Sequence, residues 1–403
     1  MAERARETLI ESVAGAGAAT ASSLEDRGRG TPLIAVREYP NLDSVPADVT
    51  AFIDSVGGRY FCASAVWFRA VLATAGLAID RPRVYVAASA AGVLAVLIVR
   101  ERTNAGPLKM RVVSSPSRGM DAAIYAPLLD PEHGEPGLRA IVRSMVRGKP
   151  PVHVVRLECF DPESPDFATL VKLLREFHLR VETFADAFST YSEDVHGLTI
   201  EQYLAVRAPE MQEFMSNQLG AFAATGRGRF EVVTGGRDLA PALVDYALID
   251  LQSWKEQELF PDCLARVVDA AAKAGVLRLC MLYVDDRPAA AQIWIVSGGR
   301  ATMWRSHFGR QFAVLALGAV VTYEAIRHIL ASERPSRLEF GPATDTGRQE
   351  WLSRRCQRIN FIAFNLRTAK GWAALARHYL GISARSAVQR IRQRRDRLLG
   401  RTE

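Results

Sequence analysis

The pattern of hydrophobic and polar positions predicts the same order of elements twice along the chain. Strands are predicted where apolar residues alternate or form short runs, and helices where they recur every three or four residues. The first half is predicted to hold a strand, two helices, three strands, and then a helix, strand, helix and strand. These elements are expected at residues 32–36, 47–56, 65–75, 83–88, 93–100, 110–114, 136–146, 152–158, 165–177 and 180–190.

The second half repeats this order after one long helix predicted at 199–225, for which Thr199 is the expected N-cap. The repeat is expected at residues 229–234, 239–256, 262–274, 277–284, 288–297, 300–308, 317–330, 337–340, 347–354 and 357–364. Short turns at 285–288 and 297–300 predict that three of its strands form an antiparallel meander. The helix after them predicts a crossover to a parallel fourth strand.

The repeated order predicts an α+β fold with two tandem domains, each a mixed, mostly antiparallel sheet flanked by helices. We expect a flexible leader at 1–30, an N-terminal domain at 31–195, a C-terminal domain at 196–368 and a helical basic tail at 369–403. The longest apolar run, residues 84–99, is shorter than the roughly 20 residues that a membrane-spanning helix needs. Because it breaks at Ala91-Gly92, it predicts two buried strands joined by a tight turn.

Composition and charge limit the classes of function. Of the 403 residues, 49% are hydrophobic and 24% are charged, which is typical of globular proteins with sizeable cores. Most of the net charge of +7 comes from residues 385–403, which contain seven arginines and two acidic residues and so carry +5. The rest of the chain carries only +2. The body of the protein is therefore not predicted to bind nucleic acid.

The cysteines and the first residues bear on the compartment. Five cysteines, odd in number and widely spaced, form no C-x-x-C pair, which argues against a disulfide framework and a zinc site. No continuous apolar signal segment follows Met1. We therefore expect a cytoplasmic protein without a metal. The basic stretch at 383–401 adds the expectation of peripheral contact with the inner face of the membrane, beside the plainer interpretation of a solvated tail.

Several short motifs are similar to those of a known family. They are Gln252-Ser253-Trp254-Lys255 at the end of a helix, Asp285-Asp286-Arg287-Pro288-Ala289-Ala290-Ala291-Gln292 at a hairpin, Arg337-Leu338-Glu339-Phe340-Gly341-Pro342 on a strand, and then Asp345, Arg348 and Trp351. With the order of elements, they resemble GNAT acyltransferases of the branch called BioF2-like or CelD-like, which is related to the Fem aminoacyl transferases. The resemblance covers residues 201–366 well and 33–100 faintly.

Three departures from the family pattern bear on the site. Ala316-Leu317-Gly318 stands where the family has Ser-Pro-Gly, and Phe308-Gly309 stands where Tyr-Asp is usual. Arg305 and Arg348 occupy positions where lysine is common. These changes affect the expected cofactor contacts and substrate more than the expected fold.

The resemblance implies an N-acyltransferase that moves an acyl group from acyl-CoA, with acetyl-CoA as the expected donor, to an amine by direct attack. It also implies a bacterial cell-envelope or exopolysaccharide setting. The sequence contains neither a G-x-S-x-G elbow nor a convincing Cys/His pair, which argues against a covalent enzyme intermediate. Two other functions stay open. One is a Fem-like aminoacyl transferase that uses charged tRNA and acts on a lipid-linked or peptidoglycan precursor; the other is a non-catalytic accessory protein of polysaccharide biosynthesis.

The start of the helix predicted at 317–330 is the candidate cofactor site, because helix N-termini bind phosphate groups. Leu317, Gly318, Ala319 and Val320 supply backbone N–H groups there, and Arg310 adds positive charge. Gly318 also allows a close approach of the backbone to the cofactor. An ordinary apolar helix start explains the same residues, so it is the order of elements that favours acyl-CoA.

His307 is the candidate catalytic base, because an imidazole titrates near neutral pH and can take a proton from an attacking amine. Alternation along the predicted strand places Arg305 on the same face, where its charge would keep His307 neutral. A lone histidine on a strand is more often structural. Tyr323 and Glu324 on the following helix are weaker candidates, and Tyr323 is expected in the core.

Asp345, Arg348 and Lys255 complete the set of candidate residues. Asp345 is expected to orient or deprotonate the substrate at the open end of the sheet, although capping of the next helix explains it as well. Lys255 and Arg348, together with Arg305, are the candidates for substrate binding, since the family resemblance implies an anionic group there. A solvated lysine at a helix end and a weak surface pair remain the alternative explanations.

Overall fold

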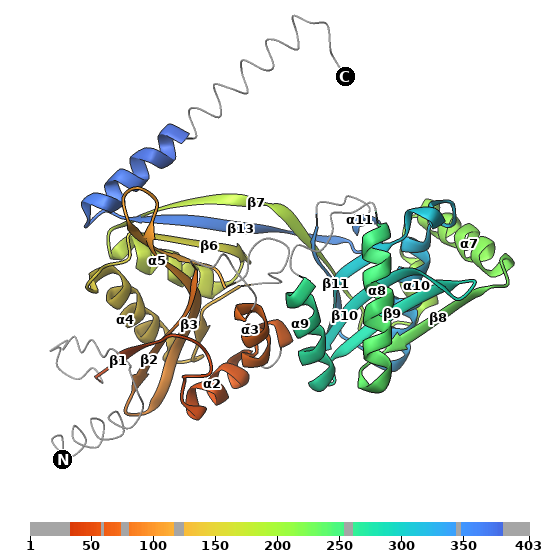
Figure 1. The fold of residues 1–403 in the computed structure, drawn as a ribbon, viewed down its shortest axis with the longest axis horizontal. Helices are drawn as coiled ribbons and strands as arrows, with labels where there is room; N and C mark the ends of the chain where they lie inside the picture. Colours follow the sequence, from red (N-terminus) through yellow and green to blue (C-terminus); the bar gives the residue numbers. More distant parts are fainter. Residues whose placement is uncertain are drawn as a thin grey trace, which may run out of the picture.

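The computed structural model describes residues 33–57, 60–73, 80–116, 125–253, 261–343 and 348–381 of the 403-residue chain. Two α+β halves lie side by side and share one sheet (Figure 1). The expected leader at 1–30 and the arginine-rich stretch at 383–401 lie outside the described residues.

The first half follows the predicted order of elements. Its elements are β1 (Ala35–Tyr39), α2 (Ala47–Gly57), η1 (Phe61–Ala63), α3 (Ala65–Leu72), β2 (Arg81–Ser89), β3 (Gly92–Ala105), β4 (Met110–Ser114), β5 (Leu128–Leu129), α4 (Gly134–Arg147), β6 (Val154–Phe160), α5 (Pro165–Glu176) and β7 (Leu179–Asp194). The apolar run at 84–99 forms β2 and β3, which meet at the pair Ser89 and Gly92. The prediction of two buried strands joined by a tight turn is therefore confirmed.

The second half also has the predicted order. Its elements are α6 (Ile200–Ala205), α7 (Pro209–Ala224), β8 (Gly228–Val233), η3 (Gly236–Asp238), α8 (Leu239–Gln252), α9 (Pro261–Lys273), β9 (Leu277–Val284), β10 (Arg287–Ser297), β11 (Arg300–Phe308), η4 (Arg310–Leu315), α10 (Leu317–Ser332), β12 (Arg337–Ala343), α11 (Arg348–Trp351) and β13 (Arg354–Asn365). Strands β9, β10 and β11 form the expected antiparallel meander, and β12 runs parallel to β11.

The single long helix predicted at 199–225 is wrong. Thr199 does begin a helix, with a capping box in which Thr199 and Gln202 bond each other's backbone N–H groups. That helix, α6, ends at Ala205, and α7 starts with Pro209 in its first turn. The residue before a proline is driven out of the helical region, and Ala208 accordingly has φ −55° and ψ 141°. Apolar spacing runs through this break, so periodicity alone hides it.

The sheet joins the two halves strand by strand. It has 13 strands in the order β1-β2-β3-β4-β6-β13-β7-β12-β11-β10-β9-β8, with β5 beside β3. From one end of the sheet, the meander β1-β2-β3-β4 is followed by β6, which is parallel to β4. From the other end, the meander β8-β9-β10-β11 is followed by β12, which is parallel to β11. The α+β fold built from two like halves is therefore confirmed.

The halves exchange their last strands. β13, the final strand of the second half, lies between β6 and β7 of the first half, and β7 pairs with β12 of the second half. Each half is thus completed by a strand from the other. The boundary expected at 195/196 stays a prediction, and a cut there would separate β7 from both of its neighbours.

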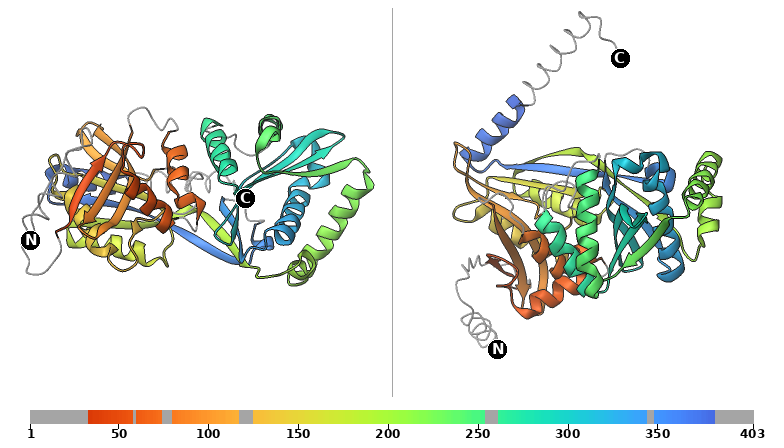
Figure 2. Two further views of the ribbon diagram at one scale, coloured as in Figure 1. Left: turned by 90° about the horizontal axis from the view of Figure 1, so that it is seen from below. Right: turned by 45° about the vertical axis from the view of Figure 1, so that its right-hand side comes forward.

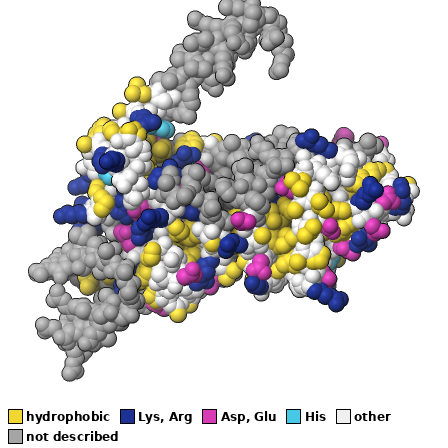
Figure 3. All heavy atoms as spheres, viewed as in Figure 1, with side chains coloured by type: hydrophobic (Ala, Val, Ile, Leu, Met, Phe, Trp, Pro, Cys, Tyr) yellow, Lys and Arg dark blue, Asp and Glu magenta, His cyan; other side chains and the backbone are white. Residues whose placement is uncertain are grey.

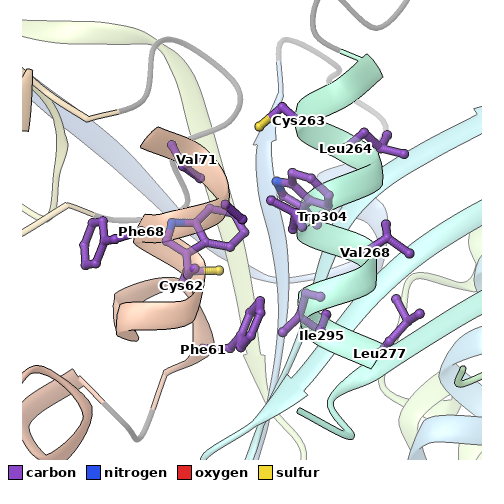
Figure 4. Packing of buried hydrophobic residues seen from close by; sticks show 14 of the residues in the cluster. Phe61, Cys62, Phe68, Val71, Cys263, Leu264, Val268, Leu277, Ile295 and Trp304 are labelled. Carbon is purple, nitrogen blue, oxygen red and sulfur yellow. The ribbon is translucent and has the colours of Figure 1, made fainter. Parts of the chain in front are cut away.

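A shared hydrophobic core also joins the halves. Figure 4 shows η1 and α3 facing α9 and the strands β10 and β11 across this core. The ring of Trp67 lies edge-on to that of Trp304 at 5.6 Å, and the ring of Phe61 lies 5.9 Å from Trp67. Because all three rings are buried, this contact holds the halves in one arrangement.

Helices cover both faces of the second half's sheet. α7 and α10 lie on one face, and α8 and α9 lie on the face toward the first half (Figure 2). α8 buries Tyr246 and Ile249 in the shared core. Its outer side exposes Val244, Leu248 and Leu251, within the hydrophobic area that Figure 3 shows over this helix.

The chain continues past β13 as a helix over residues 369–381. Ala374 and Leu375 pack on Val154 and Phe364, so the helix lies on the first half's strands. At the start of this helix, the backbone of Gly371 approaches the end of β13 so closely that a Cβ there would lie 2.0 Å from the carbonyl oxygen of Asn365. In the part of the chain that the structure describes, no helix combines the length and apolar character needed to cross a membrane.

Candidate functional site

The parallel ladder between β11 and β12 stops half-way along β11. It joins residues 300–303 to residues 337–340, and its last pair is Met303 with Phe340. Beyond that pair, β12 stays with β7, whereas residues 305–308 of β11 pair only with β10 among the described strands. Gly341 marks the divergence, because a Cβ there would lie 3.0 Å from the carbonyl oxygen of Met303. We call the segments 304–308 and 341–343 the β11–β12 break.

The helix α10 begins beside this break without a side-chain cap. Its N-cap residue Ala316 has left-handed backbone angles of φ 45° and ψ 41°, and no acidic residue stands in the first turn. The N–H groups of Ala319 and Val320 donate to the Ala316 carbonyl, at 2.8 and 3.4 Å. The N–H groups of Leu317 and Gly318 stand at the start of the helix, where no carbonyl group of the same helix can accept a hydrogen bond from them. This first turn is therefore the part of α10 suited to an anion.

Side-chain hydrogen bonds from β10 and from the next turn of α10 fix the position of the first turn of α10. The side chain of Gln292, fully buried on β10, donates to the Thr322 hydroxyl at 2.7 Å and accepts from the indole N–H of Trp294 at 2.8 Å. The Thr322 hydroxyl in turn donates to the carbonyl oxygen of Gly318 at 2.7 Å. The ring of Phe308 lies 3.0 Å from the place of a Gly318 Cβ, so a larger residue there would press on it. A buried and satisfied polar network of this kind fixes one geometry.

The opposite face of β11 carries the predicted pair Arg305 and His307. They lie opposite Ile293 and Ala291 of β10, both in the core shared with the first half, so the prediction of a common face is confirmed. A bulge at Trp304 adds a residue to β11, and the Arg305 guanidinium lies over the Trp304 ring at 4.3 Å. Bulges often redirect side chains next to active sites.

His307 has an acidic neighbour from α8. Its Nδ1 atom lies 3.1 Å from Oδ1 of Asp250, and its ring stands edge-on to Tyr246 with the centroids 5.5 Å apart. His307 is 5% exposed. The 3.1 Å contact of Asp250 Oδ1 with Nδ1 is an ion-pair contact without hydrogen-bond geometry, and Nε2 lies on the other side of the imidazole ring. His307 therefore stays a candidate for the general base.

Comparison with known proteins gives a family model for this part of the chain. Residues 213–351 match the family model described as an acetyltransferase (GNAT) domain. The chain carries a GNAT domain. This domain contains the β11–β12 break, α10 and the pair Asp250 and His307. Such folds transfer acyl groups and generally bind acyl-CoA. None of the curated proteins searched matches the sequence.

Several solved structures are similar to most of the chain. FemX is 10% identical, with 80% of this chain and 97% of that chain covered and a TM-score of 0.55. L-PGS from Bacillus licheniformis is 11% identical, with 84% and 97% covered and a TM-score of 0.48. A tandem GNAT protein from the clavulanic acid biosynthesis pathway is 12% identical, with 81% and 98% covered and a TM-score of 0.43. At these identities the likeness concerns the fold.

The first half repeats the GNAT order, but its equivalent break is closed. After the parallel pairs of β4 and β6, the Ser115 N–H donates to the Arg156 carbonyl, and the Glu158 N–H donates to the Ser115 hydroxyl. The Tyr125 N–H then donates to the Cys159 carbonyl at 3.1 Å. The edge of β6 is thus hydrogen-bonded beyond its parallel pairs with β4, whereas the parallel pairs of β11 with β12 end at Met303.

The helix after this closed ladder also differs from α10. Asp130 accepts the N–H groups of Glu132 and His133 before α4, and the N–H of His133 is the main cause that lowers the pKa of the Asp130 carboxyl. Glu135 adds a second acid in the first turn of α4. Negative charge at this helix start disfavours a pyrophosphate. Of these two helix starts, that of α10 in the GNAT domain is therefore the one better suited to a pyrophosphate.

The structure brings some of the predicted residues together and leaves others undescribed. Leu317 and Val320 have buried side chains, so only their backbones can serve a cofactor, and Arg310 is exposed at the start of η4. Lys255 and Asp345 lie outside the described residues, as does the side chain of Arg348 at the start of α11. Their expected roles stay predictions.

Two residues of the site were not found from the sequence. Asp250 is hidden in the helical pattern of α8, and only its contact with His307 across the fold reveals it. Gln292 is part of the hairpin motif, but its position on a strand gives no sign that it supports α10. Among the described residues, no group of three or more His, Cys, Asp or Glu side chains could hold a metal ion.

Two of the buried cysteines in the described part of the chain are poorly suited to thiol chemistry. Burial raises the pKa of Cys62 to about 12 and holds the pKa of Cys280 above its usual value. We expect iodoacetamide at about pH 8 to label Cys62 and Cys280 roughly a thousandfold more slowly than the half-buried Cys356, because the thiolate is the reactive form. Peptide mass spectrometry of the native and the unfolded protein measures this. Equal labelling of all three in the native state would contradict it.

Proposed function

We propose that the protein is an acyl-CoA-dependent N-acyltransferase, with acetyl-CoA as the expected donor and an amine as the acceptor. One observation carries the proposal: the ladder between β11 and β12 ends beside the uncapped start of α10. A GNAT fold uses such a place for acyl-CoA. The closed ladder and the acidic helix start of the first half support the choice of this half.

The donor is expected to bind with its pyrophosphate at the first turn of α10. The N–H groups of Leu317 and Gly318 and the exposed guanidinium of Arg310 are the groups for it. The pantetheine arm carries amide groups, which suit the backbone of β11 beyond Met303. The thioester would then reach the face of the sheet that carries Arg305 and His307.

The transfer itself needs one proton to move. The amine nitrogen attacks the thioester carbonyl carbon, the carbon–sulfur bond breaks, and coenzyme A leaves with the bonding electrons on sulfur. His307 takes the proton that the amine loses, through Nε2, while Asp250 holds Nδ1. Arg305 lies on the same face and is a candidate for binding the acceptor.

The acceptor and its setting remain proposals. A cell-envelope or exopolysaccharide amine, and peripheral membrane contact through the basic tail, rest on the family resemblance. A Fem-like aminoacyl transferase is the second candidate, because the likeness to FemX extends over both halves. That function would take its acyl group from charged tRNA, so the choice of donor distinguishes the two.

Release of the coenzyme A thiol measures the proposed reaction directly. The full chain is incubated with acetyl-CoA and a panel of amines, and free thiol is followed with and without each amine. The proposal expects amine-dependent release. If none of the amines causes thiol release but the protein transfers an aminoacyl group from aminoacyl-tRNA, the result favours the Fem-like function. If the protein catalyses neither reaction, the result favours a non-catalytic role.

A further inference from the structure

Three strand ladders break at one level in the middle of the sheet. The register shifts between Phe340 and Ala343 in β12 with β7, between Gln357 and Ile359 in β13 with β7, and between Ile359 and Phe361 in β13 with β6. The levels coincide because Ala343 and Gln357 both lie opposite Ser189. This is also the stretch of β12 that leaves β11, so the irregular level borders the β11–β12 break.

Arg358 is buried at this level. It is 5% exposed, and its Nε and Nη1 atoms have no hydrogen-bond partner. Oδ2 of Asp161 lies 3.3 Å from Nη1, an ion-pair contact without hydrogen-bond geometry, and the Asp161 side chain is 36% exposed. A buried cation with unused donors is unfavourable unless another group satisfies them.

The neighbours of Arg358 do not supply that group. Tyr60 lies near both Arg358 and Glu339: burial raises the pKa of Tyr60 well above its usual value, with a smaller raising effect from Glu339 and an opposing effect from Arg358. The two oxygens of Glu339 accept from Arg300 at 3.0 Å and from the Thr302 hydroxyl at 3.2 Å. The Glu339 carboxylate is therefore already bonded to β11.

The same face offers a second unused donor. The indole Nε1 of Trp304 is buried without a hydrogen-bond partner, and Trp304 is the bulge residue of β11 beside Arg305. Both unsatisfied groups, Arg358 and Trp304, are donors. A region that presents donors and positive charge suits an oxyanion, and a guanidinium binds the planar or tetrahedral oxygens of carboxylate and phosphate with two parallel hydrogen bonds.

We propose that Arg358 is a specificity-determining residue that binds an anionic group, a carboxylate or a phosphate, on the acceptor. The inference rests on the proposed acyl transfer and names the class of acceptor: an amine that carries a negative charge at some distance from its nitrogen. The first half then contributes to substrate binding through Asp161 and Tyr60, which both lie near Arg358. The exchanged strand β13 carries the anchor itself.

Anion binding tests the proposal without any turnover. Thermal unfolding of the full chain is followed with glutarate, with inorganic phosphate and with the neutral control glutaramide, for the wild type, Arg358→Met, Arg358→Lys and Arg354→Met. Arg354 is the matched control, an arginine of the same strand that is half exposed and bonded to Glu163. Glutarate and phosphate separate the two sources of the anion.

We expect one or both anions to raise the Tm of the wild type and of Arg354→Met, whereas Arg358→Met should lose this shift and Arg358→Lys should keep part of it. Without anions, Arg358→Met should be at least as stable as the wild type, because an unsatisfied buried charge has been removed. The proposal is overturned if neither anion acts on the wild type, if the shift survives in Arg358→Met, or if Arg358→Met lowers the Tm in every condition as a purely structural arginine would.

Steady-state kinetics provide a second test of the role of Arg358. For an amine that bears a carboxylate or phosphate, Arg358→Met should raise KM by about 10- to 100-fold with little change in kcat, and a neutral amine of the same length should be unaffected. Acetyl-CoA binding, measured separately, should be the same in both proteins. Anion binding that depends on Arg358 in a protein without acetyl-CoA affinity would support this subsite and reject the proposed acyl transfer.

Discussion

Replacing His307 with glutamine is expected to lower kcat by about 100- to 10,000-fold, the usual contribution of a general base. Glutamine keeps a polar group of similar size at a 5% exposed position, but it cannot take a proton. Acetyl-CoA should bind with unchanged affinity, because His307 lies on the opposite face of β11 from Ser306 and the first turn of α10. Stopped assays of thiol release and a binding titration measure the two effects.

Two control variants test whether the loss of kcat comes from the loss of the His307 imidazole as a base. His328→Gln changes a histidine on α10 outside the site and should leave kcat unaltered. Asp250→Asn keeps the shape of the residue 3.1 Å from His307 but removes its charge, so it should reduce kcat less than the loss of the imidazole. If His307→Gln kept wild-type turnover, His307 would be a structural residue and the amine would lose its proton elsewhere.

Replacing Phe361 with alanine is expected to reduce the free energy of unfolding by about 3–5 kcal/mol, the usual loss for a buried phenylalanine. Phe361 belongs to β13 of the second half, yet it is fully buried in the core of the first half. Its ring lies 5.4 Å from that of Phe160 and 6.3 Å from that of Phe167. Because β13 completes the first half, both halves should unfold in one destabilised transition, as measured by denaturant titration.

The control for this change is Phe184→Ala on the neighbouring strand β7. Phe184 is 41% exposed and lies opposite Asn360, next to Phe361, so it offers the same substitution at the surface. Its loss should cost about 1 kcal/mol or less. Two separate transitions, with only the second half affected by Phe361→Ala, would show that strand exchange does not couple the halves.

The order of elements was predictable because it depends on local patterns. The apolar run at 84–99, the turns on either side of β10 and the start of α10 at Leu317 all follow from hydrophobic spacing and turn residues. The strand exchange could not be predicted this way. A strand's alternation fixes which side chains are buried, but it does not say whether its neighbour comes from the same half. Strand length gives no sign of it either, since β3, which is not exchanged, has 14 residues against 12 in β13.

The site was predictable in part for the same reason. Gly318 and its neighbours are consecutive residues, and the shared face of Arg305 and His307 follows from alternation along a strand. Asp250 lies on α8 and contacts His307 on β11, with α9, β9 and β10 between them in the chain. Arg358 of the second half contacts Asp161 of the first half. Such contacts depend on the tertiary fold and leave no pattern in a single sequence.

Calorimetric titration with acetyl-CoA tests the central claim most directly. The wild type should bind one equivalent, and Gly318→Asp should weaken binding by about 100-fold or more, because a carboxylate would stand at the start of α10 where the pyrophosphate is expected. Gly220→Asp on the exposed side of α7 is the matched control and should bind as the wild type does. Arg310→Glu, at an exposed position, checks the same charge effect without the contact to Phe308. No binding by the wild type at about millimolar acetyl-CoA, or equal binding by all four proteins, would contradict an acyl-CoA site at α10.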